Sequence, residues 1–584
     1  MSVENLITEH LDIWTSAIKT KSAAGRGSSK KLELVGVKKL RELILELAVR
    51  GKLVPQDPND EPASELLKRI EAEKAQLIKA GKIKKQKSLP QITEEEIRFE
   101  LPKNWACERL TNLYDVRDGT HDTPKYHETG YPLVTSKNIS SGTLDLSNVK
   151  LISEEDYIKI NERSKVERND ILFAMIGSIG NPVLVDIEPE FSIKNVALFK
   201  CYSKKLSSPS YLLRFLLFAE TIMKAEASGA VQSFVSLGAV RKFVMAVPPL
   251  PEQHRIVAKV DELMALCDQL EVQTESSIDA HKTLVEVLLA TLTNVKDADE
   301  LNENWQTISQ HFDVLFTTQA SIDQLKQTIL QLAVMGKLVK QDPKDEPASK
   351  LLERIATEKQ QLIKDGKIKK QKPLPPISDE EKPFALPSGW EWAYLNSLLP
   401  QFQNGASSRG DKGGKDVIVL RLADIKNWKI SLNDTRTLEI AAETIKRYSL
   451  KKGDVLIIRV NGSADIVGRF ITCESDLDTI YCDHFIRMNF PIECLFTPYL
   501  FLLGSSDLIR SKIANLFVST AGQKTVNQTH IGTLPISLPP FAEQERIVEK
   551  VDELMALCDS LKERLNQAQT TQLHLTDAIV EQAL

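Results

Sequence analysis

A segment of forty residues occurs twice in this chain of 584 residues, at 51–90 and at 336–375, with 31 of the 40 positions identical. A second segment is repeated at 252–268 and 543–559, with 15 of 17 positions identical. Between these near-copies lie two long stretches that barely resemble each other. Because matched segments flank unmatched ones, the pattern predicts one duplicated frame that carries two different modules.

The length of the chain and the positions of the repeats predict its domains. A chain this long exceeds a single hydrophobic core, and we expect three or more domains. The predicted order is a helical repeat with a linker, a first module, a long helix followed by a second helical repeat and linker, a second module, and a C-terminal coiled-coil helix. These segments span residues 1–100, 101–249, 250–385, 386–540 and 541–584.

The repeated frame carries helix signals. Residues 1–22 predict a helix, and AAGRGSS at 23–29 predicts a flexible break after it. Apolar residues at helical spacing predict helices over 40–51 and 325–336, each ending at a glycine suited to a left-handed C-cap. A further amphipathic helix is expected to start at the proline at position 62, and its copy repeats the pattern.

The two modules carry strand signals instead. Short β-like runs such as NDILFAMIG and VALFKCY recur in the first module, and GDVLIIRVNG and HFIRMNF recur in the second. Each module closes with one helical stretch and a proline-rich exit. We therefore predict two α/β (α+β) modules in tandem, separated by long helices.

Those long helices carry an apolar heptad pattern, in which steps of four and three residues alternate. Such a pattern predicts that the two helices pair side by side along a coiled-coil seam. The predicted seam residues are Ile256, Val260, Leu263, Cys267 and Leu270 in the first helix, and Ile547, Val551, Leu554, Cys558 and Leu561 in the second.

The charge distribution separates the modules from the frame. The whole chain has a net charge of −5, whereas residues 101–249 sum to +1 and residues 386–540 to +2, so the surplus acid lies in the frame. The modules are therefore the part better suited to a polyanion. The sequence has no apolar run long enough to span a bilayer and starts without a signal peptide, which predicts a cytoplasmic protein without a membrane role.

The sequence shows no recognisable catalytic or cofactor motif. The glycine-rich stretch at 404–416 fails as a phosphate-binding loop, because Asp416 follows the lysine where Ser or Thr is required. The chain contains no HExxH or GxSxG motif, and its seven cysteines form no CxxC pair. We therefore expect no catalytic residues, no metal site and no cofactor on this chain.

The repeated segments carry a resemblance to a known family. AVRGKLVPQDPNDEPASELLKRI followed by GKIKKQK and LPKNW, together with the exit PPLPEQHRIVAKVDELMALCD, resembles the specificity subunits of type I restriction–modification systems over essentially the whole chain. The resemblance implies that each module recognises one half of a split, asymmetric double-stranded DNA target. It also implies that antiparallel helices set the spacer and that the repeats dock two methyltransferase subunits.

The resemblance places the chemistry on partner subunits. The methyltransferase subunits would bind S-adenosylmethionine and methylate adenine at N6. Restriction subunits, which are translocases and nucleases using ATP and Mg²⁺, would join the same assembly. This chain would be the non-catalytic subunit of that complex.

Polar loops in the two modules supply the candidate DNA contacts. Such loops combine glycines with hydrogen-bonding and aromatic side chains, a composition that suits a DNA groove, although an ordinary surface turn is the alternative. The candidates in the first module are Arg117, Thr120, His121, Lys125, Tyr126, Ser136, Lys137 and Asn138. Those in the second are Asn404, Ser407, Ser408, Arg409, Lys412, Lys415, Arg421, Asn461, Gln523, Lys524 and Asn527.

Three other functional classes predict different behaviour toward DNA. A stand-alone two-domain DNA-binding regulator would bind its site without partners, yet the longest repeats lie outside the modules. A nuclease with dispersed acidic residues would cut DNA with Mg²⁺ alone. A coiled-coil scaffold without a nucleic-acid role would not retain DNA at all.

Overall fold

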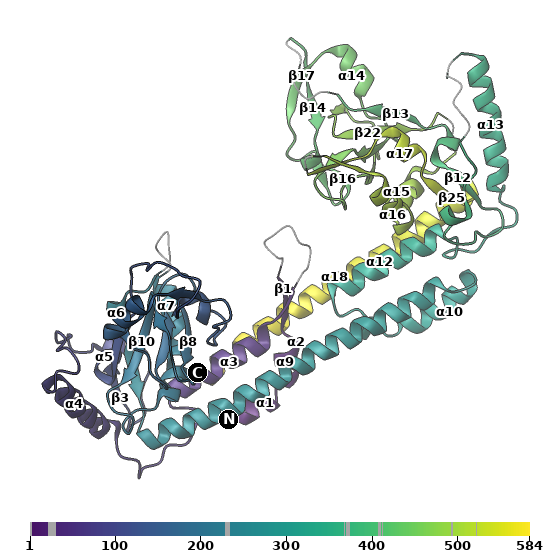
Figure 1. Ribbon diagram of the computed structural model, residues 1–584. Coiled ribbons are helices and arrows are strands. Elements are labelled where there is room, and N and C mark those ends of the chain that lie inside the picture. Colours follow the sequence, from purple (N-terminus) through teal and green to yellow (C-terminus); the bar gives the residue numbers. More distant parts are fainter. Residues whose placement is uncertain are drawn as a thin grey trace. The chain divides into compact units, whose positions relative to one another are not determined.

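The computed structural model describes residues 3–21, 31–227, 234–366, 368, 374–406, 410, 413–491, 494–520 and 522–584, and the chain divides into two compact units (Figure 1). The first unit comprises Met1–Ser276 with Ala568–Leu584, and the second comprises Ser277–Gln567. The boundaries fall inside two long helices, α9 (Leu250–Thr293) and α18 (Phe541–Ala583). Each unit therefore contains the front part of one long helix and the back part of the other.

The N-terminal segment is not the single helix that was expected. It forms two short helices, α1 (Val3–Thr8) and α2 (Leu11–Ser16), and then strand β1 (Ile18–Lys21), which pairs antiparallel with β2 (Lys31–Leu34). The fully buried Trp14 donates its indole N–H to the carbonyl of Leu6 at 3.3 Å, which folds the two helices against each other. The predicted break at 23–29 lies outside the described residues.

In the first unit, helix α3 (Val35–Val49) lies beside both long helices. Arg41 donates to Asp268 of α9 at 2.7 Å and to Glu271 at 2.8 Å. From a neighbouring position, Lys39 pairs with Asp577 near the end of α18. The charged groups therefore line α3 where it faces its two neighbours, and its apolar face is buried.

In the second unit, helix α12 (Gln319–Val334) takes the same place. Lys326, the repeat equivalent of Arg41, contacts Asp559 of α18 at 2.5 Å. Gln324 contacts Glu286 of α9 at 3.3 Å, in the position that corresponds to the Lys39 pair. The two halves of the frame therefore repeat their contacts as well as their sequence.

Contacts along α12 fix the directions of the long helices within this unit. Asp323 faces Lys562 and Lys326 faces Asp559, so α12 runs antiparallel to α18. Gln324 of α12 contacts Glu286 of α9, and Lys337, three residues beyond the end of α12, donates to the carbonyl of Thr293, so α12 runs parallel to α9. The two long helices are therefore antiparallel here.

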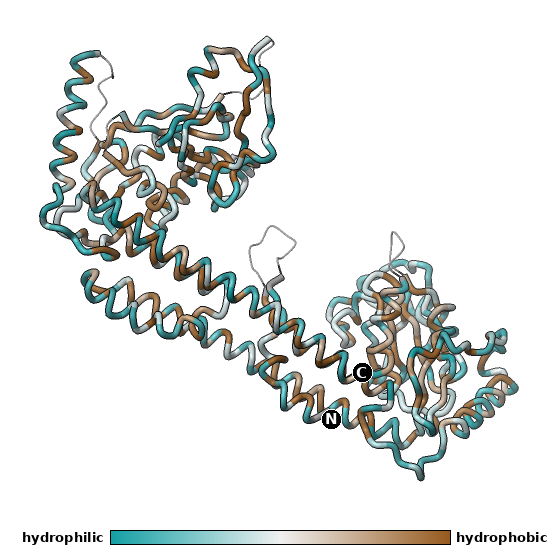
Figure 2. The backbone as a smooth tube through the Cα atoms, turned by 180° about the vertical axis from the view of Figure 1, so that it is seen from behind, coloured by the Kyte–Doolittle hydropathy of each residue, from teal (hydrophilic) through white to brown (hydrophobic). Residues whose placement is uncertain are grey.

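The structure buries the predicted heptad seam and packs a shorter helix of the frame beside it in each unit. All ten seam residues are buried except Leu270, which is half-buried. The first five lie in the first unit, where α3 runs beside α9. The other five lie in the second unit, in one apolar cluster with α12 and with Val285, Leu289 and Leu292 of α9. A heptad pattern identifies the buried face of a helix but not the helix that covers it. Figure 2 shows hydrophobic residues recurring at intervals along both long helices.

Each frame half adds one amphipathic helix, α4 (Ala63–Lys79) in the first unit and α13 (Ala348–Lys364) in the second. The second unit also contains α10 (Ala298–Ser309) and α11 (Phe312–Leu315), ahead of α12. No helix among the described residues combines the length and the apolar character needed to cross a membrane.

The first module is mixed α/β, as expected. Its main sheet has the strand order β4-β10-β7-β8, with all neighbours antiparallel, and α7 packs against β8. A second sheet has the order β6-β5-β9, and β11 pairs with β3 where the chain enters and leaves. The elements are β3 (Ala106–Arg109), α5 (Leu110–Leu113), β4 (Tyr114–Asp118), β5 (Tyr131–Val134), β6 (Lys150–Ile152), α6 (Glu154–Ser164), β7 (Ile171–Ala174), β8 (Gly180–Leu184), β9 (Ser192–Ile193), β10 (Val196–Cys201), α7 (Pro209–Ala227), α8 (Leu237–Lys242) and β11 (Val244–Val247).

The second module repeats this topology with a different sequence. Its main sheet has the order β13-β22-β18-β20, a second sheet has the order β17-β14-β21, and β12 pairs with β25. The elements are β12 (Glu391–Tyr394), β13 (Gln401–Asn404), β14 (Lys415–Leu420), β15 (Ile425–Lys426), β16 (Lys429–Ile430), β17 (Thr437–Ile440), α14 (Ala442–Tyr448), β18 (Val455–Ile458), β19 (Val460–Asn461), β20 (Phe470–Thr472), β21 (Thr479–Tyr481), β22 (Phe485–Asn489), α15 (Thr497–Ser505), α16 (Asp507–Leu516), β23 (Val518–Thr520), β24 (Gln523–Thr525), α17 (Gln528–Gly532) and β25 (Pro535–Leu538).

The glycine after α3 leads to a stability prediction. Gly51 has φ +69°, and a Cβ atom there would lie 2.4 Å from Cγ of Pro102. Gly81, after α4, has φ +72° but nothing within 4 Å of that position. We expect Gly81→Ala to cost about 1–2 kcal/mol in free energy of unfolding, from backbone strain alone. Gly51→Ala should cost about 1–3 kcal/mol more, because the methyl group overpacks the start of the module.

Urea unfolding of the two variants measures this difference directly. Both substitutions place alanine at a left-handed residue, so Gly81→Ala is the matched control. Equal losses would show that Gly51 and Pro102 do not form a rigid contact.

Candidate nucleic-acid interface

In each module, the C-terminal end of the first strand in the main sheet contacts an equivalent turn, the one that precedes the neighbouring strand. Gly119 follows β4 and donates its N–H to the carbonyl of Val196 at 3.1 Å, and Gly405 follows β13 and donates to Phe485 at 3.0 Å. A Cβ atom at either glycine would lie about 2 Å from a backbone carbonyl oxygen, so only glycine fits. In both modules, the C-terminal end of this strand and the turn before its neighbour are therefore held together by an equivalent glycine.

In the first module this junction carries a polar cluster, here called the first polar face: Asp118, His121, Arg163 and Asn195. The buried Asp118 contacts Nε2 of the exposed His121 at 2.8 Å and also pairs with Arg163 of α6. The other ring nitrogen of His121 lies 3.1 Å from the side-chain oxygen of Asn195. One buried carboxylate thus orients an imidazole and a guanidinium at the surface.

In the second module the same junction carries the second polar face: Asn404, Arg459, Asp483, His484 and Gln528. Gln528 of α17 donates to the side-chain oxygen of Asn404 at 3.1 Å. The backbone N–H of Arg459 donates to the carbonyl of His484 at 2.7 Å, which places the β18 end beside the turn before β22. Asp483 and His484 are exposed there.

The two polar faces occupy equivalent positions but carry different side chains. Asp118 corresponds to Asn404, since these residues directly precede Gly119 and Gly405. Asn195 corresponds to His484, since these residues directly precede β10 and β22, and the first residue of each strand accepts the glycine N–H. One geometry therefore presents unlike sets of donors and acceptors, a requirement for recognising unlike base sequences.

The structure places the predicted residues of the first module at different depths. His121 belongs to the first polar face, and Lys125, Tyr126 and Lys137 are exposed, whereas Thr120 and Ser136 are half-buried. Nε of Arg117 donates to Asp115 at 2.8 Å. The buried Asn138 accepts from Thr135 and donates to the carbonyl of Asp145 at 3.1 Å, so its amide is occupied by the fold.

The structure also places the predicted residues of the second module at different positions. Asn404 belongs to the second polar face, and Asn461 pairs with Lys524 where β19 meets β24. Gln523 and Asn527 are exposed nearby in sequence, and Asn527 caps α17. Arg421 is paired with Asp424 at 2.8 Å, and Lys415 is exposed at the far end of β14. Ser407, Ser408, Arg409 and Lys412 lie outside the described residues.

Sequence reasoning did not identify several residues of these faces. Asn195 and the pair Asp483–His484 each interrupt an apolar stretch between two strands, and that short polar interruption is a signal that the sequence offers. Arg163 and Gln528 lie on helices distant in sequence, and no local pattern identifies them. Cys482, Asp483 and His484 place three possible metal-ligand atoms within 4.8 Å of one another, but the equivalent turn in the first module has Lys194 and Asn195.

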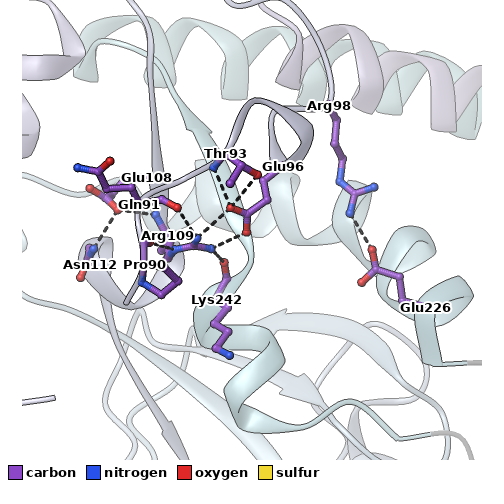
Figure 3. Close-up of polar contacts among 10 residues, drawn as sticks. All are labelled: Pro90, Gln91, Thr93, Glu96, Arg98, Glu108, Arg109, Asn112, Glu226 and Lys242. Carbon is purple, nitrogen blue, oxygen red and sulfur yellow. Dashed lines mark hydrogen bonds and ion pairs between the residues drawn. The ribbon is translucent and has the colours of Figure 1, made fainter. Parts of the chain in front are cut away.

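A buried arginine anchors the linker that leads into the first module (Figure 3). Arg109 donates to the Glu96 carboxylate at 2.9 Å and 3.0 Å, to the carbonyl of Pro90 at 3.2 Å and to that of Lys242 at 2.7 Å. Thr93 donates its N–H to the same carboxylate at 3.0 Å. The corresponding linker in the second unit binds through Glu381 and the hydroxyl of Tyr394, at 3.2 Å. Both linkers are therefore held on their modules.

This anchor predicts a pH dependence. The hydrogen bond from Arg109 lowers the pKa of Glu96 from 4.5 to about 2. A depressed carboxyl pKa contributes stability above the unfolded value of 4.5, and that stability is lost as the pH falls toward the folded value. We expect Glu96→Gln to destabilise the first unit at neutral pH, by a difference that shrinks below about pH 4.5.

Urea unfolding of the native chain and of Glu96→Gln, from neutral pH down to about pH 3.5, measures that difference. Thr93→Val is a useful companion, because it removes a hydroxyl beside the carboxylate but keeps the ion pair. A difference that stays constant over this range would contradict the role given to the ion pair.

The chain has two modules of one topology on a duplicated helical frame, and their polar faces differ. This arrangement is typical of a protein that carries two recognition domains in tandem. The family model for the type I restriction modification DNA specificity domain matches twice, at residues 102–280 and 388–570. The chain therefore belongs to the specificity subunits of type I restriction–modification systems, with two tandem DNA specificity domains.

Two curated relatives match this chain over their full length. The chain is 42% identical to the type I restriction enzyme EcoEI specificity subunit of Escherichia coli and 42% identical to the EcoAI specificity subunit, in both cases over 100% of both chains. A chain from a structural study of complex assembly and conformational transition of the type I restriction–modification system aligns over 83% of this chain and 98% of its own, at 16% identity and a TM-score of 0.44. The HsdS subunit from Thermoanaerobacter tengcongensis aligns at 17% identity, over 84% and 98% of the two chains, with a TM-score of 0.38.

Proposed function

We propose that this chain is the non-catalytic subunit that gives a type I restriction–modification complex its DNA sequence specificity, with each module reading one half of a split, asymmetric target. The observation that carries this proposal is the pair of polar faces. They lie at equivalent positions of one fold but present different side chains. The two modules would therefore dock on DNA in the same way and recognise different base sequences.

The chemistry of the faces fits base edges. Asparagine and glutamine amides pair with adenine, arginine pairs with guanine, and carboxylates accept from cytosine. In the first polar face, Asp118 holds His121 and Arg163 in fixed orientations. Prepositioned donors recognise a base with less loss of conformational freedom on binding.

The duplicated frame supports two copies of one partner, which we propose are two methyltransferase subunits. Leu266 of α9 and Leu557 of α18 are repeat equivalents, with exposed fractions of 40% and 36%. Leu284 and Leu575 form a second exposed pair. Each unit therefore presents one leucine of each pair, and a repeated apolar surface suits two identical partners.

The remaining parts of the assembly follow from the same proposal. S-adenosylmethionine would be bound by the methyltransferase subunits, which would modify adenine at N6. Restriction subunits that use ATP and Mg²⁺ would bind to the methyltransferase–specificity assembly. None of these ligands would require a site on this chain.

Methylome sequencing of a host that carries this chain and its methyltransferase tests the proposal. We expect N6-methyladenine in a bipartite motif whose two halves differ and are separated by bases of any identity. A continuous motif, or the absence of new methylation beside an active methyltransferase, would contradict it.

A further inference from the structure

Each long helix begins with a buried glutamate that joins three segments of its own unit. Glu252 is 1% exposed and accepts from the indole N–H of Trp105 at 3.1 Å and from the side-chain amide of Gln56 at 2.7 Å. The contacts link the first turn of α9, the first residues of the module and the connector after α3. They form what is here called the first joint.

The second unit repeats this arrangement as the second joint. Glu543 is fully buried and accepts from Trp390 and from Gln341, both at 3.1 Å. One turn further along, a second polar bond links the helix to the connector in each unit, at 2.6 Å in both. These bonds are Arg255–Asp60 and Arg546–Asp345.

Burying a carboxylate at each joint is energetically unfavourable compared with apolar packing. Burial raises the pKa of both glutamates, which shows that the charged carboxylate is disfavoured at these positions. Apolar side chains of similar size would hold the segments together at least as well. The glutamate and the glutamine recur within the repeated segments of the frame, and the tryptophan recurs near the start of each module, although the modules differ almost throughout.

A buried, hydrogen-bonded carboxylate not only holds the module on the helix but also fixes the orientation of the module. Apolar packing is not directional, so a module held by it alone could tilt on its helix. Hydrogen bonds to Glu252 from two donors on different segments permit one orientation, because leaving either donor unpaired costs free energy. The joint therefore fixes the angle between module and helix.

We propose that the two joints are positioning elements that set how strictly the protein measures the gap between its two half-sites. The inference rests on the proposed reading of a bipartite target. One base pair changes the separation of two sites by about 3.4 Å and their relative rotation by about 35°. A module that can tilt will therefore reach a half-site displaced by one base pair, and a rigid one will not.

Glu252→Gln tests this with a nearly isosteric change. The amide that replaces the carboxylate has one acceptor oxygen, so its NH₂ group must face the N–H of either Trp105 or Gln56. The complex of the full chain with its methyltransferase is given a DNA library in which the gap length varies and the half-sites are constant. We expect methylation at gaps one base pair too long or too short to rise about tenfold relative to the correct gap.

A rescue variant separates positioning from folding. Adding Gln56→Glu to Glu252→Gln exchanges donor and acceptor, so that both bonds of the joint can form again. The first joint suits this exchange because Gln56 is exposed and its second bond, to the carbonyl of Gly51, is long at 3.3 Å. We expect the double variant to regain strict gap selection.

Two further variants keep the inference testable if Glu252→Gln folds poorly. Trp105→Phe removes one donor and keeps an aromatic ring, and Glu543→Gln breaks the second joint alone. Both should relax gap selection and leave the bases of each half-site unchanged. The inference is overturned if well-folded variants lose methylation equally at every gap length. Failure of the parental complex to methylate any bipartite target would instead overturn the proposed function.

Discussion

The double variant Leu266→Glu/Leu557→Glu should weaken assembly with both methyltransferase subunits, and either single variant should leave mainly a complex with one methyltransferase. Burying a leucine contributes about 1.5–3 kcal/mol, so each charged substitution should weaken its own interface at least tenfold. The two interfaces should fail independently, because the leucines lie in different units. Light scattering on size-exclusion fractions gives the mass of each complex.

Val272 supplies the matched control. It is 66% exposed on α9, more than Leu266, but its repeat equivalent is Glu563. It is therefore absent from the duplicated surface, and Val272→Glu should leave assembly unchanged. If Val272→Glu disrupted the complex as strongly as Leu266→Glu, the two duplicated leucines would not define the docking surface.

The second large effect is expected at the polar faces. Asn404→Ala and His484→Ala should each reduce base discrimination by about 5- to 150-fold, at one or two positions in one half of the target only. His121→Ala in the first module is the reciprocal control and should affect only the other half. Methylation of randomised half-sites, read by sequencing, separates these outcomes. Equal losses in both halves from any one variant would contradict the assignment of one half-site to each module.

Much of the fold could be predicted from sequence because it is repeated. The repeats locate the frame, and their glycines mark helix ends where the backbone has a positive φ, as at Gly51 and Gly336. The strand runs locate the sheets of both modules. The packing of α3 and α12 beside the long-helix seam could not be predicted in the same way, since an apolar face at helical spacing does not identify its neighbours.

The polar faces were only partly predictable for a different reason. His121 and Asn404 lie in loops whose composition indicates a binding role. Their neighbours come from other segments, as Asn195 and Gln528 show. Only the strand order of the sheets brings these residues together, and strand order is not encoded in any local pattern. Asn138 shows the converse, since its polar loop resembles a binding site but the buried side chain caps a turn.

Exchange of residues 101–249 for the corresponding module of a relative with a different target tests the central claim most directly. Methylome sequencing of the exchanged chain, expressed with the same methyltransferase, should reveal a motif in which one half is new and the other half and the gap are unchanged. A motif changed in both halves, or unchanged in both, would contradict the account of one frame carrying two independent readers.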